Sequence, residues 1–149
     1  MTICLKPRLP RFGMLRRGDP CGRPSVPPFV ELTDLGKIVQ ETFAYLETQY
    51  PVSVPVYIVM PDHIHAIFLL EQRATARVAP TLGQVVGAYK SKVFVQCLSL
   101  YKSRNLMLGP LWQRGYYEHI IRNEEDFIST AEYILGNPAR WAENQNATP

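Results

Sequence analysis

The sequence predicts an α+β domain of the ferredoxin-like class, a split βαβ antiparallel sheet with helices on one face and an added C-terminal helix. The main observation is the order of apolar runs, which follows the pattern β-α-β-β-α-β-α. A second observation is that 149 residues with 46% hydrophobic content suit a single core. We therefore expect one domain over residues 1–149.

The first third of the chain predicts a short strand, a long irregular stretch and a helix. Thr2 to Leu5 is a candidate strand, whereas six prolines between Pro7 and Pro28 predict a mostly unstructured, Pro- and Arg-rich segment up to residue 30. A helix is expected from Asp34 to Thr48, because apolar residues recur there at helical spacing. They are Leu35, Ile38, Val39, Phe43 and Leu46.

A β-hairpin and a second helix are expected next. Val54–Met60 and His63–Leu70 are rich in β-branched, aromatic and other apolar residues, and Pro61-Asp62 between them is a turn signal. Thr81 is followed three residues later by Gln84, which is the form of a capping box. The second helix should therefore begin at Leu82.

The last part predicts a fourth strand over Leu111–Arg122 and a final helix capped by Asn123. Three acidic residues, Glu124 to Asp126, fill the first turn, where the helix dipole favours negative charge. The residues expected to face the core share one stripe of this helix. They are Phe127, Ile128, Ala131, Ile134 and Leu135.

Charge and cysteine content narrow the function classes. The net charge of +3 and the basic run between Lys6 and Arg23 allow a phosphate-contacting arm, although a solvated basic loop explains the run equally well. The three cysteines form no C-x-x-C pair, which argues against a disulfide framework and against a thiolate zinc site. With no leader-like or membrane-spanning apolar run, we expect an unsecreted cytoplasmic protein with no membrane partner.

His63 and His65 lie two residues apart at the start of a predicted strand. Side chains alternate between the two faces of a strand, so both imidazoles should point the same way. Paired neutral imidazoles form half of a metal site. A pair of polar residues at a strand edge is the alternative interpretation of the spacing alone.

Tyr133 lies on the final helix, well away from the middle of its apolar stripe. At about 100° per residue it shares the polar face with Asn137, four residues later. A phenol and an amide oxygen could then meet one target. The alternative is a surface tyrosine and an asparagine that ends the helix before Pro138.

Three segments together resemble a known family. MPDHIHAIF, LWQRGYYEHIIRNEEDF and EYILGNPARW are similar to the hallmark segments of the REP-associated tyrosine transposases, a branch of the single-tyrosine HUH transposases. LGQVVGAYKSK resembles the helix between the first two, and MTIC the end of the family's first strand. The resemblance covers about Leu32 to Trp141. The stretch from Gly18 to Pro28 looks inserted, and a start at Met1 would shorten the first strand.

The resemblance implies an activity and a set of roles. Tyr133 would be the nucleophile that cleaves single-stranded DNA, often beside a hairpin, to give a 5′-phosphotyrosine and a free 3′-hydroxyl. His63, His65 and Asn137 would hold a divalent ion, Mg²⁺ or Mn²⁺. A free phenol, with a pKa of about 10, is a weak nucleophile at neutral pH, and an ion on the scissile phosphate would assist the attack. The partner would be single-stranded or hairpin DNA in the nucleoid, with a homodimer as one option.

Further residues are weaker candidates. Phosphate contacts are expected at four basic positions: Lys90, Lys92, Arg114 and Arg122. Tyr116 and Tyr117 are rival nucleophiles, because Tyr117 shares a strand face with His119, and packing within an aromatic strand is the alternative interpretation. Two other functions compete with the active transposase: a DNA-hairpin-binding module of the same fold without catalysis, and a structural metal-binding protein unrelated to DNA.

Overall fold

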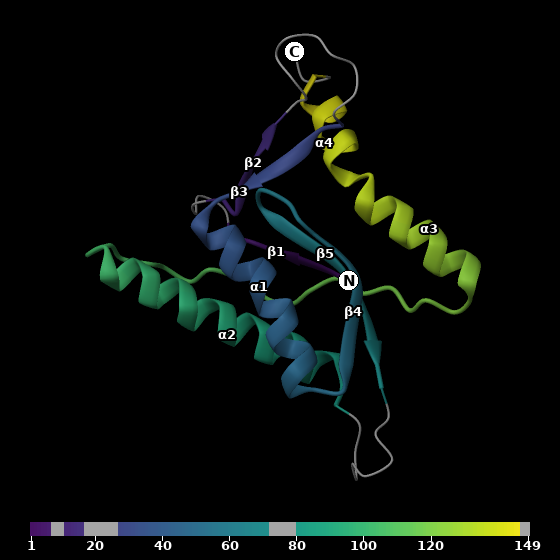
Figure 1. Cartoon of the computed structure of the whole chain (residues 1–149), viewed down its shortest axis with the longest axis horizontal. Coiled ribbons are helices and arrows are strands. Elements are labelled where there is room, and N and C mark those ends of the chain that lie inside the picture. The colour runs from purple at the N-terminus through teal and green to yellow at the C-terminus, as the bar shows by residue number, and fades with distance from the viewer. Residues whose placement is uncertain (7–10, 17–26, 72–79, 147–149) are drawn as a thin grey trace.

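The computed structural model of the chain describes residues 1–6, 11–16, 27–71 and 80–146 (Figure 1). The strands are β1 (Thr2–Cys4), β2 (Gly13–Arg16), β3 (Phe29–Leu32), β4 (Val52–Val59) and β5 (His63–Leu70). The helices are α1 (Asp34–Gln49), α2 (Leu82–Ser103), α3 (Glu124–Leu135) and α4 (Asn137–Asn146). The expected ends of the first helix and of the hairpin are confirmed to within two residues.

The central sheet is antiparallel, in the order β1-β5-β4. Its register sets Thr2 opposite His65 and Cys4 opposite His63. On the far side of β1, isolated bridges join Thr2 to Tyr117 and Leu5 to Trp112. The chain around residues 112–117 therefore occupies the position of a fourth strand, and the spatial order is that of a ferredoxin-like fold.

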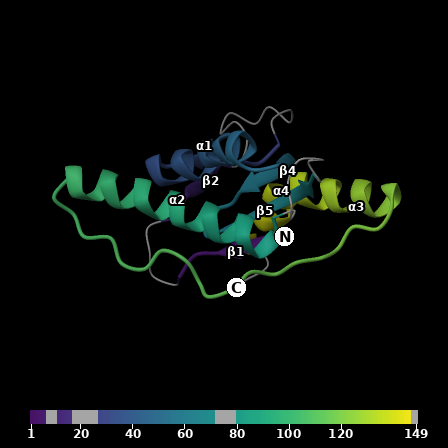
Figure 2. The ribbon, with the colours of Figure 1, turned by 90° about the horizontal axis from the view of Figure 1, so that it is seen from below.

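The prediction of a regular strand over Leu111–Arg122 was wrong. Only the two bridges form, and Gly115 turns the chain with a φ of 78°. The ammonium of Lys90, on α2, donates to the carbonyl oxygens of Gln113 and Gly115. These oxygens are therefore engaged by a side chain instead of by the backbone N–H groups of a neighbouring strand. Figure 2 shows this segment as a long trace beneath the sheet, joining α2 to α3.

Helices α1 and α2 cover one face of the sheet. Ile3, Ile64 and Ala66 from the strands are fully buried in one cluster with Phe43 of α1 and Tyr89 of α2. The rings of Phe43 and Tyr89 stack with centroids 4.7 Å apart. Because side chains alternate along a strand, His63 and His65 point to the opposite face.

The expectation that residues 1–30 are mostly irregular was wrong in part, because β2 and β3 pair as an antiparallel hairpin. Phe12 anchors the hairpin: its side chain is fully buried and its carbonyl oxygen accepts from the backbone of Thr33. Proline counts missed these strands because the prolines fall mostly between them rather than within them. Several residues of the basic run, Arg8, Arg17 and Arg23, lie outside the described residues.

Asn123 caps α3 as expected, with its side chain accepting from the backbone N–H of Asp126 at 2.8 Å. The helix ends at Leu135, however, and Asn137 begins α4, so Tyr133 and Asn137 lie on separate helices. The predicted core stripe was also wrong in part, since Ile128 is 49% exposed and Leu135 63% exposed. No helix within the described residues is long and apolar enough to span a membrane.

Candidate active site

The turn at Pro61-Asp62 fixes the start of β5. The carbonyl oxygen of Pro61 accepts from the backbone N–H of Phe12, and that of Asp62 accepts from the N–H of Leu5, both at 2.8 Å. The turn is thus held by two segments near the N-terminus. The first histidine of β5 follows it directly.

His63 and His65 lie side by side on the sheet face opposite α1 and α2. Their ring centroids are 4.7 Å apart with the planes at 77°. The side chain of His65 is buried, with only 8% of its surface exposed. Burial, then the nearby His63, then the N-terminal ammonium lower the pKa of His65 from 6.5 to about 4. His65 is therefore neutral at physiological pH, the form that ligates metals.

Each imidazole has a partner on Nδ1. The Nδ1 of His63 lies 2.7 Å from a carboxylate oxygen of Asp62, and the Nδ1 of His65 lies 2.8 Å from Oγ1 of Thr2. A carboxylate only accepts, so the proton of a neutral His63 is on Nδ1 and its Nε2 keeps a free lone pair. The Thr2 hydroxyl can accept from His65 in the same way. This is how metal-ligating histidines are usually oriented.

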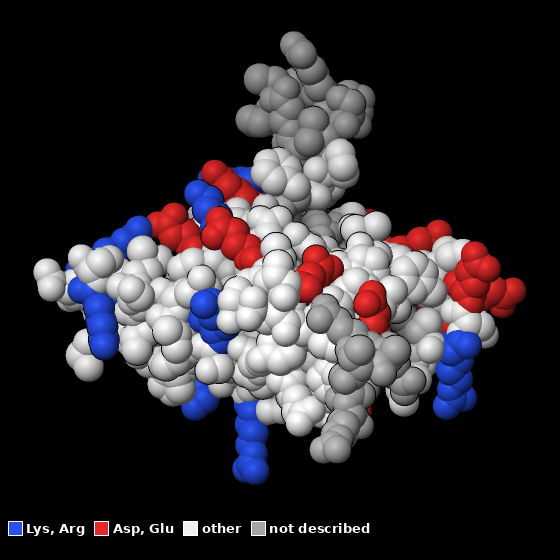
Figure 3. Space-filling view, turned by 60° about the horizontal axis from the view of Figure 1, so that its bottom comes forward, with Lys and Arg blue, Asp and Glu red and all other residues white. Residues whose placement is uncertain are grey.

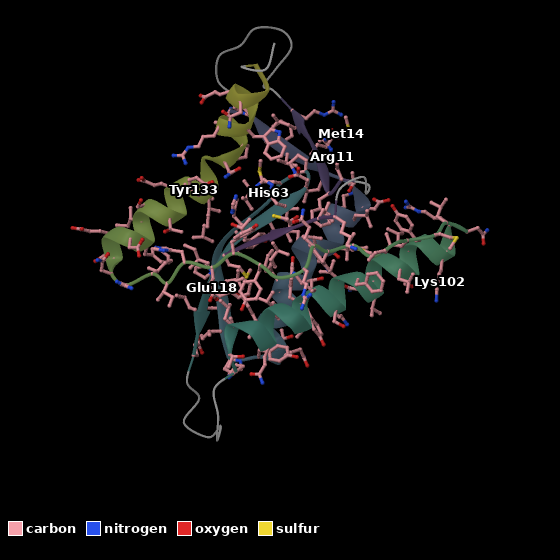
Figure 4. The ribbon with its side chains drawn as sticks, turned by 180° about the vertical axis from the view of Figure 1, so that it is seen from behind. Arg11, Met14, His63, Lys102, Glu118 and Tyr133 are labelled. Atoms are coloured by element: carbon pink, nitrogen blue, oxygen red, sulfur yellow. The ribbon has the colours of Figure 1, made fainter. Side chains whose placement is uncertain are left out.

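Tyr133 of α3 packs against the second of the two histidines. Its ring centroid is 5.5 Å from that of His65, and the planes are at 75°. The side chain is 46% exposed, so the phenol remains open to a ligand. Figure 4 shows Tyr133 and His63 turned toward the same space between α3 and the sheet.

Two residues of α4 complete the surroundings, and sequence reasoning assigned neither of them here. Arg140 holds its guanidinium carbon 4.8 Å from the Tyr133 ring centroid. Trp141 packs on His63 with ring centroids 5.3 Å apart. Tyr133 and Arg140 lie on separate helices, so helical spacing in the sequence gives no signal that pairs them.

Asn137 is buried at the first position of α4, in the chain between the residues that contact the two histidines. Within the described residues, no group of three or more His, Cys, Asp or Glu side chains could hold a metal ion. The nitrogen donors that could hold an ion here are the Nε2 atoms of His63 and His65, and the amide oxygen of Asn137 is the oxygen donor expected from the sequence. Mixed nitrogen and oxygen ligands suit Mn²⁺ and accept Mg²⁺.

Of the two rival tyrosines, Tyr116 packs against the hydrophobic core, and Tyr117 makes no described ring contact with the histidines. Tyr117 lies opposite Thr2 in a two-way backbone hydrogen-bonded bridge, so it shares the His65 face of the sheet. Its side chain is 74% exposed, and within the described residues it makes no ring contact with either imidazole. His119 instead bonds the carboxylate of Asp126 at 2.9 and 3.0 Å.

Of the four basic residues expected to contact phosphate, two contact other protein groups and two are exposed to solvent. Lys90 is bound to backbone carbonyls, and burial lowers its pKa. Lys92 lies 4.2 Å from the Tyr45 ring centroid, whereas Arg114 and Arg122 are exposed. Figure 3 shows Lys and Arg scattered over the left and lower parts of this face and at its right end, and Asp and Glu spread across the upper part with one group at the right end.

Comparison with known proteins gives related answers from sequence and from structure. Residues 31–137 match the family of IS200-like transposases. A protein of uncharacterized function from Haemophilus influenzae is 29% identical over 162 residues, which is 97% of this chain and 82% of that protein. Another from the same organism, provisionally named a REP-associated tyrosine transposase, is 27% identical over 100 residues. That match covers 65% of this chain and 56% of the relative.

Among solved structures, one described as a REP-associated tyrosine transposase bound to a REP hairpin aligns with a TM-score of 0.65 and 19% identity. The alignment covers 94% of this chain and 65% of the other, so this chain spans less than two thirds of that protein. This likeness concerns the fold. The family match extends over the histidines, Tyr133 and Asn137, and the chain therefore belongs to the family of IS200-like transposases.

Proposed function

We propose that this chain cuts single-stranded DNA and joins the cut end to another strand, with Tyr133 as the nucleophile. The observation that carries the proposal is the contact between the Tyr133 and His65 rings, at 5.5 Å, beside His63. A partly exposed phenol next to two imidazoles that can ligate a metal ion is suited to attack a bound phosphate.

The reaction would consist of two transesterification steps, one that cleaves a strand and one that rejoins it. The Tyr133 phenol oxygen forms a bond to phosphorus, the bond from phosphorus to the 3′-oxygen breaks, and the phenol proton is balanced by the one gained by the 3′-oxygen. The phosphotyrosine ester retains the reactivity of the broken bond. A 3′-hydroxyl can attack it, which re-forms the phosphodiester and restores the phenol without ATP.

His63, His65 and Asn137 are the residues that would hold a divalent ion. When bound, Mg²⁺ or Mn²⁺ would neutralise charge on the scissile phosphate and help to align it for attack. Asp62 and Thr2 orient the two imidazoles so that both Nε2 atoms are available. Tyr133 is held by its packing on His65, which keeps the nucleophile beside the ligand pair.

Hairpin-bearing single-stranded DNA is the substrate class we propose. Support comes from the fold that this chain shares with a transposase described as bound to a REP hairpin. Arg114 and Arg122 are exposed on the segment that leads into α3, where they could contact backbone phosphates.

The test is adduct formation with labelled hairpin oligonucleotides and Mn²⁺, resolved on a denaturing gel. Wild-type protein should give a shortened strand and a covalent protein–DNA band. Tyr133→Phe keeps the ring but lacks the oxygen, so it should bind DNA and give neither product. Tyr117→Phe is the matched control and should react like wild type.

Two results would contradict the proposal. An adduct that persists in Tyr133→Phe but disappears in Tyr117→Phe would move the nucleophile to the other tyrosine. Binding of the hairpin without an adduct under Mg²⁺ or Mn²⁺ would instead identify a DNA-binding module without catalysis.

A further inference from the structure

Arg140 and Trp141 are consecutive residues near the start of α4, and each lies against one residue of the candidate site. Arg140 lies over the ring of Tyr133, and Trp141 packs on His63. The first turn of α4 carries no acidic residue. The side of the site nearest α4 is therefore lined by a cation and an indole.

The guanidinium of Arg140 is free to bind an anion. Attraction to an aromatic ring does not use up the N–H groups of a guanidinium, which can still donate to a ligand. Within the described residues no carboxylate lies within ion-pairing distance of it, unlike Arg16 and Arg104, which pair with Glu31 and Asp34. Its side chain is exposed, so a ligand in solvent can reach it.

Trp141 supplies a second, independent observation. Its indole Nε1 is buried, and it has no hydrogen-bond partner among the described residues. Buried donors are nearly always satisfied in folded proteins. Among the described residues, the indole N–H of Trp141, beside His63, thus lacks a hydrogen-bond acceptor.

We propose that Arg140 binds the phosphodiester that Tyr133 attacks, by donating to its non-bridging oxygens. The inference rests on the proposed role of Tyr133 and adds the group that binds the reacting phosphate. A planar guanidinium donates two parallel hydrogen bonds to phosphate oxygens. Placed over the phenol, it also opposes the negative charge that develops on phosphorus during the attack.

The experiment compares two substrates that differ in one charge. One hairpin oligonucleotide carries the normal phosphodiester at the cleavage position, and the other carries a neutral methylphosphonate there. Single-turnover rates are measured for wild type, Arg140→Gln, Arg140→Lys and the control Lys102→Gln. Lys102→Gln removes the same charge at the far end of α2. Figure 4 shows that Lys102 lies far from Tyr133.

Arg140→Gln should slow cleavage of the phosphodiester by about 100-fold or more, as expected for loss of a charge-stabilising donor. The deficit should shrink to a few-fold on the methylphosphonate, because there is no longer a charge to neutralise. Arg140→Lys should fall between, and Lys102→Gln should match wild type. An equal deficit on both substrates would overturn the proposal, because it would mean that Arg140 only packs Tyr133.

Binding separates this inference from the proposed function. In a Tyr133→Phe background, Arg140→Gln should weaken hairpin binding and reduce the salt dependence by about 0.7 in the slope of log K against log salt. If wild type forms no adduct but Arg140→Gln still changes the slope, the result supports the phosphate contact of Arg140 and contradicts the proposed nuclease activity. If wild type cleaves and Arg140→Gln alters neither rate nor slope, the phosphate contact is overturned alone.

Discussion

The hydroxyl oxygen of Thr2 lies 2.8 Å from Nδ1 of His65, so the first strand of the sheet orients the second histidine of the candidate site. The contact follows from the strand register, which sets Thr2 directly opposite His65. It joins residues 63 positions apart in the sequence. The orientation of the imidazole thus depends on correct pairing of β1.

Loss of this hydroxyl should weaken metal binding. Thr2→Val keeps the β-branched shape but removes the partner of Nδ1, and we expect the affinity for Mn²⁺ to fall by about 10- to 100-fold. Titration calorimetry measures the change, with Thr2→Ser as the control that retains the oxygen. Equal Mn²⁺ affinity in Thr2→Val and wild type would show that the hydroxyl does not orient a ligand.

His63→Ala and His65→Ala should reduce DNA cleavage by weakening metal binding, so a large excess of Mn²⁺ should restore part of the rate. Excess metal should restore nothing in Tyr133→Phe, because that variant lacks the attacking oxygen. Cleavage rates measured across a Mn²⁺ series test the contrast. A histidine variant that cleaves normally at low Mn²⁺ would remove that histidine from the proposed metal site.

Gly36 should not tolerate a side chain. A Cβ at this position of α1 would lie 2.0 Å from the carbonyl oxygen of Phe12, which is backbone and cannot move aside cheaply. We expect Gly36→Ala to cost about 1–3 kcal/mol of unfolding free energy. Thermal unfolding should show a midpoint lower by several degrees.

Gly87 is the matched control for Gly36, because a Cβ there meets nothing within 4 Å. Gly87→Ala lies in the interior of α2 and should stabilise the protein by about 0.5–1 kcal/mol through helix propensity. Both variants exchange one glycine for one alanine in a helix. Similar effects of the two on the midpoint would contradict the close approach of α1 to Phe12.

The basic side chains should contribute unequally to DNA binding. Arg114→Gln and Arg122→Gln should each reduce the salt dependence of hairpin binding by about 0.7, if each contacts one phosphate. Lys90→Gln should leave the slope nearly unchanged and lower thermal stability instead, because its ammonium is engaged by the carbonyl oxygens of Gln113 and Gly115. Fluorescence anisotropy at several salt concentrations separates these results. A large slope change in Lys90→Gln would place that ammonium on DNA.

Cys97 should be unreactive in the folded protein. Its side chain is fully buried, and burial raises the pKa of the thiol to about 11, so little thiolate exists at pH 8. Iodoacetamide at that pH should label Cys97 only after denaturation, as read by peptide mass spectrometry. Equal labelling before and after denaturation would show that α2 opens readily.

Several features of this protein could be predicted from local sequence. The strand alternation that sets His63 and His65 on one face acts between neighbouring residues, and so do the caps at Thr81 and Asn123. The ends of β5 and the starts of the three longer helices follow from the same signals. The family resemblance added the proposed roles of Tyr133 and Asn137, which periodicity alone left open.

Other features were decided only by tertiary structure. Leu111–Arg122 has the composition of a strand, yet Lys90 of α2 takes up two of its carbonyl oxygens. The stripe on α3 has the period of a buried face, yet Tyr133, which lies outside that stripe, packs its ring against His65 of the sheet.

The proximity of Arg140 to Tyr133, and of Thr2 to His65, likewise depends on how α4 and β1 pack against the rest of the molecule. Local sequence sets helix and strand through interactions within a few residues. The site instead depends on contacts between segments far apart in the chain, and these are selected by the packing of the whole fold.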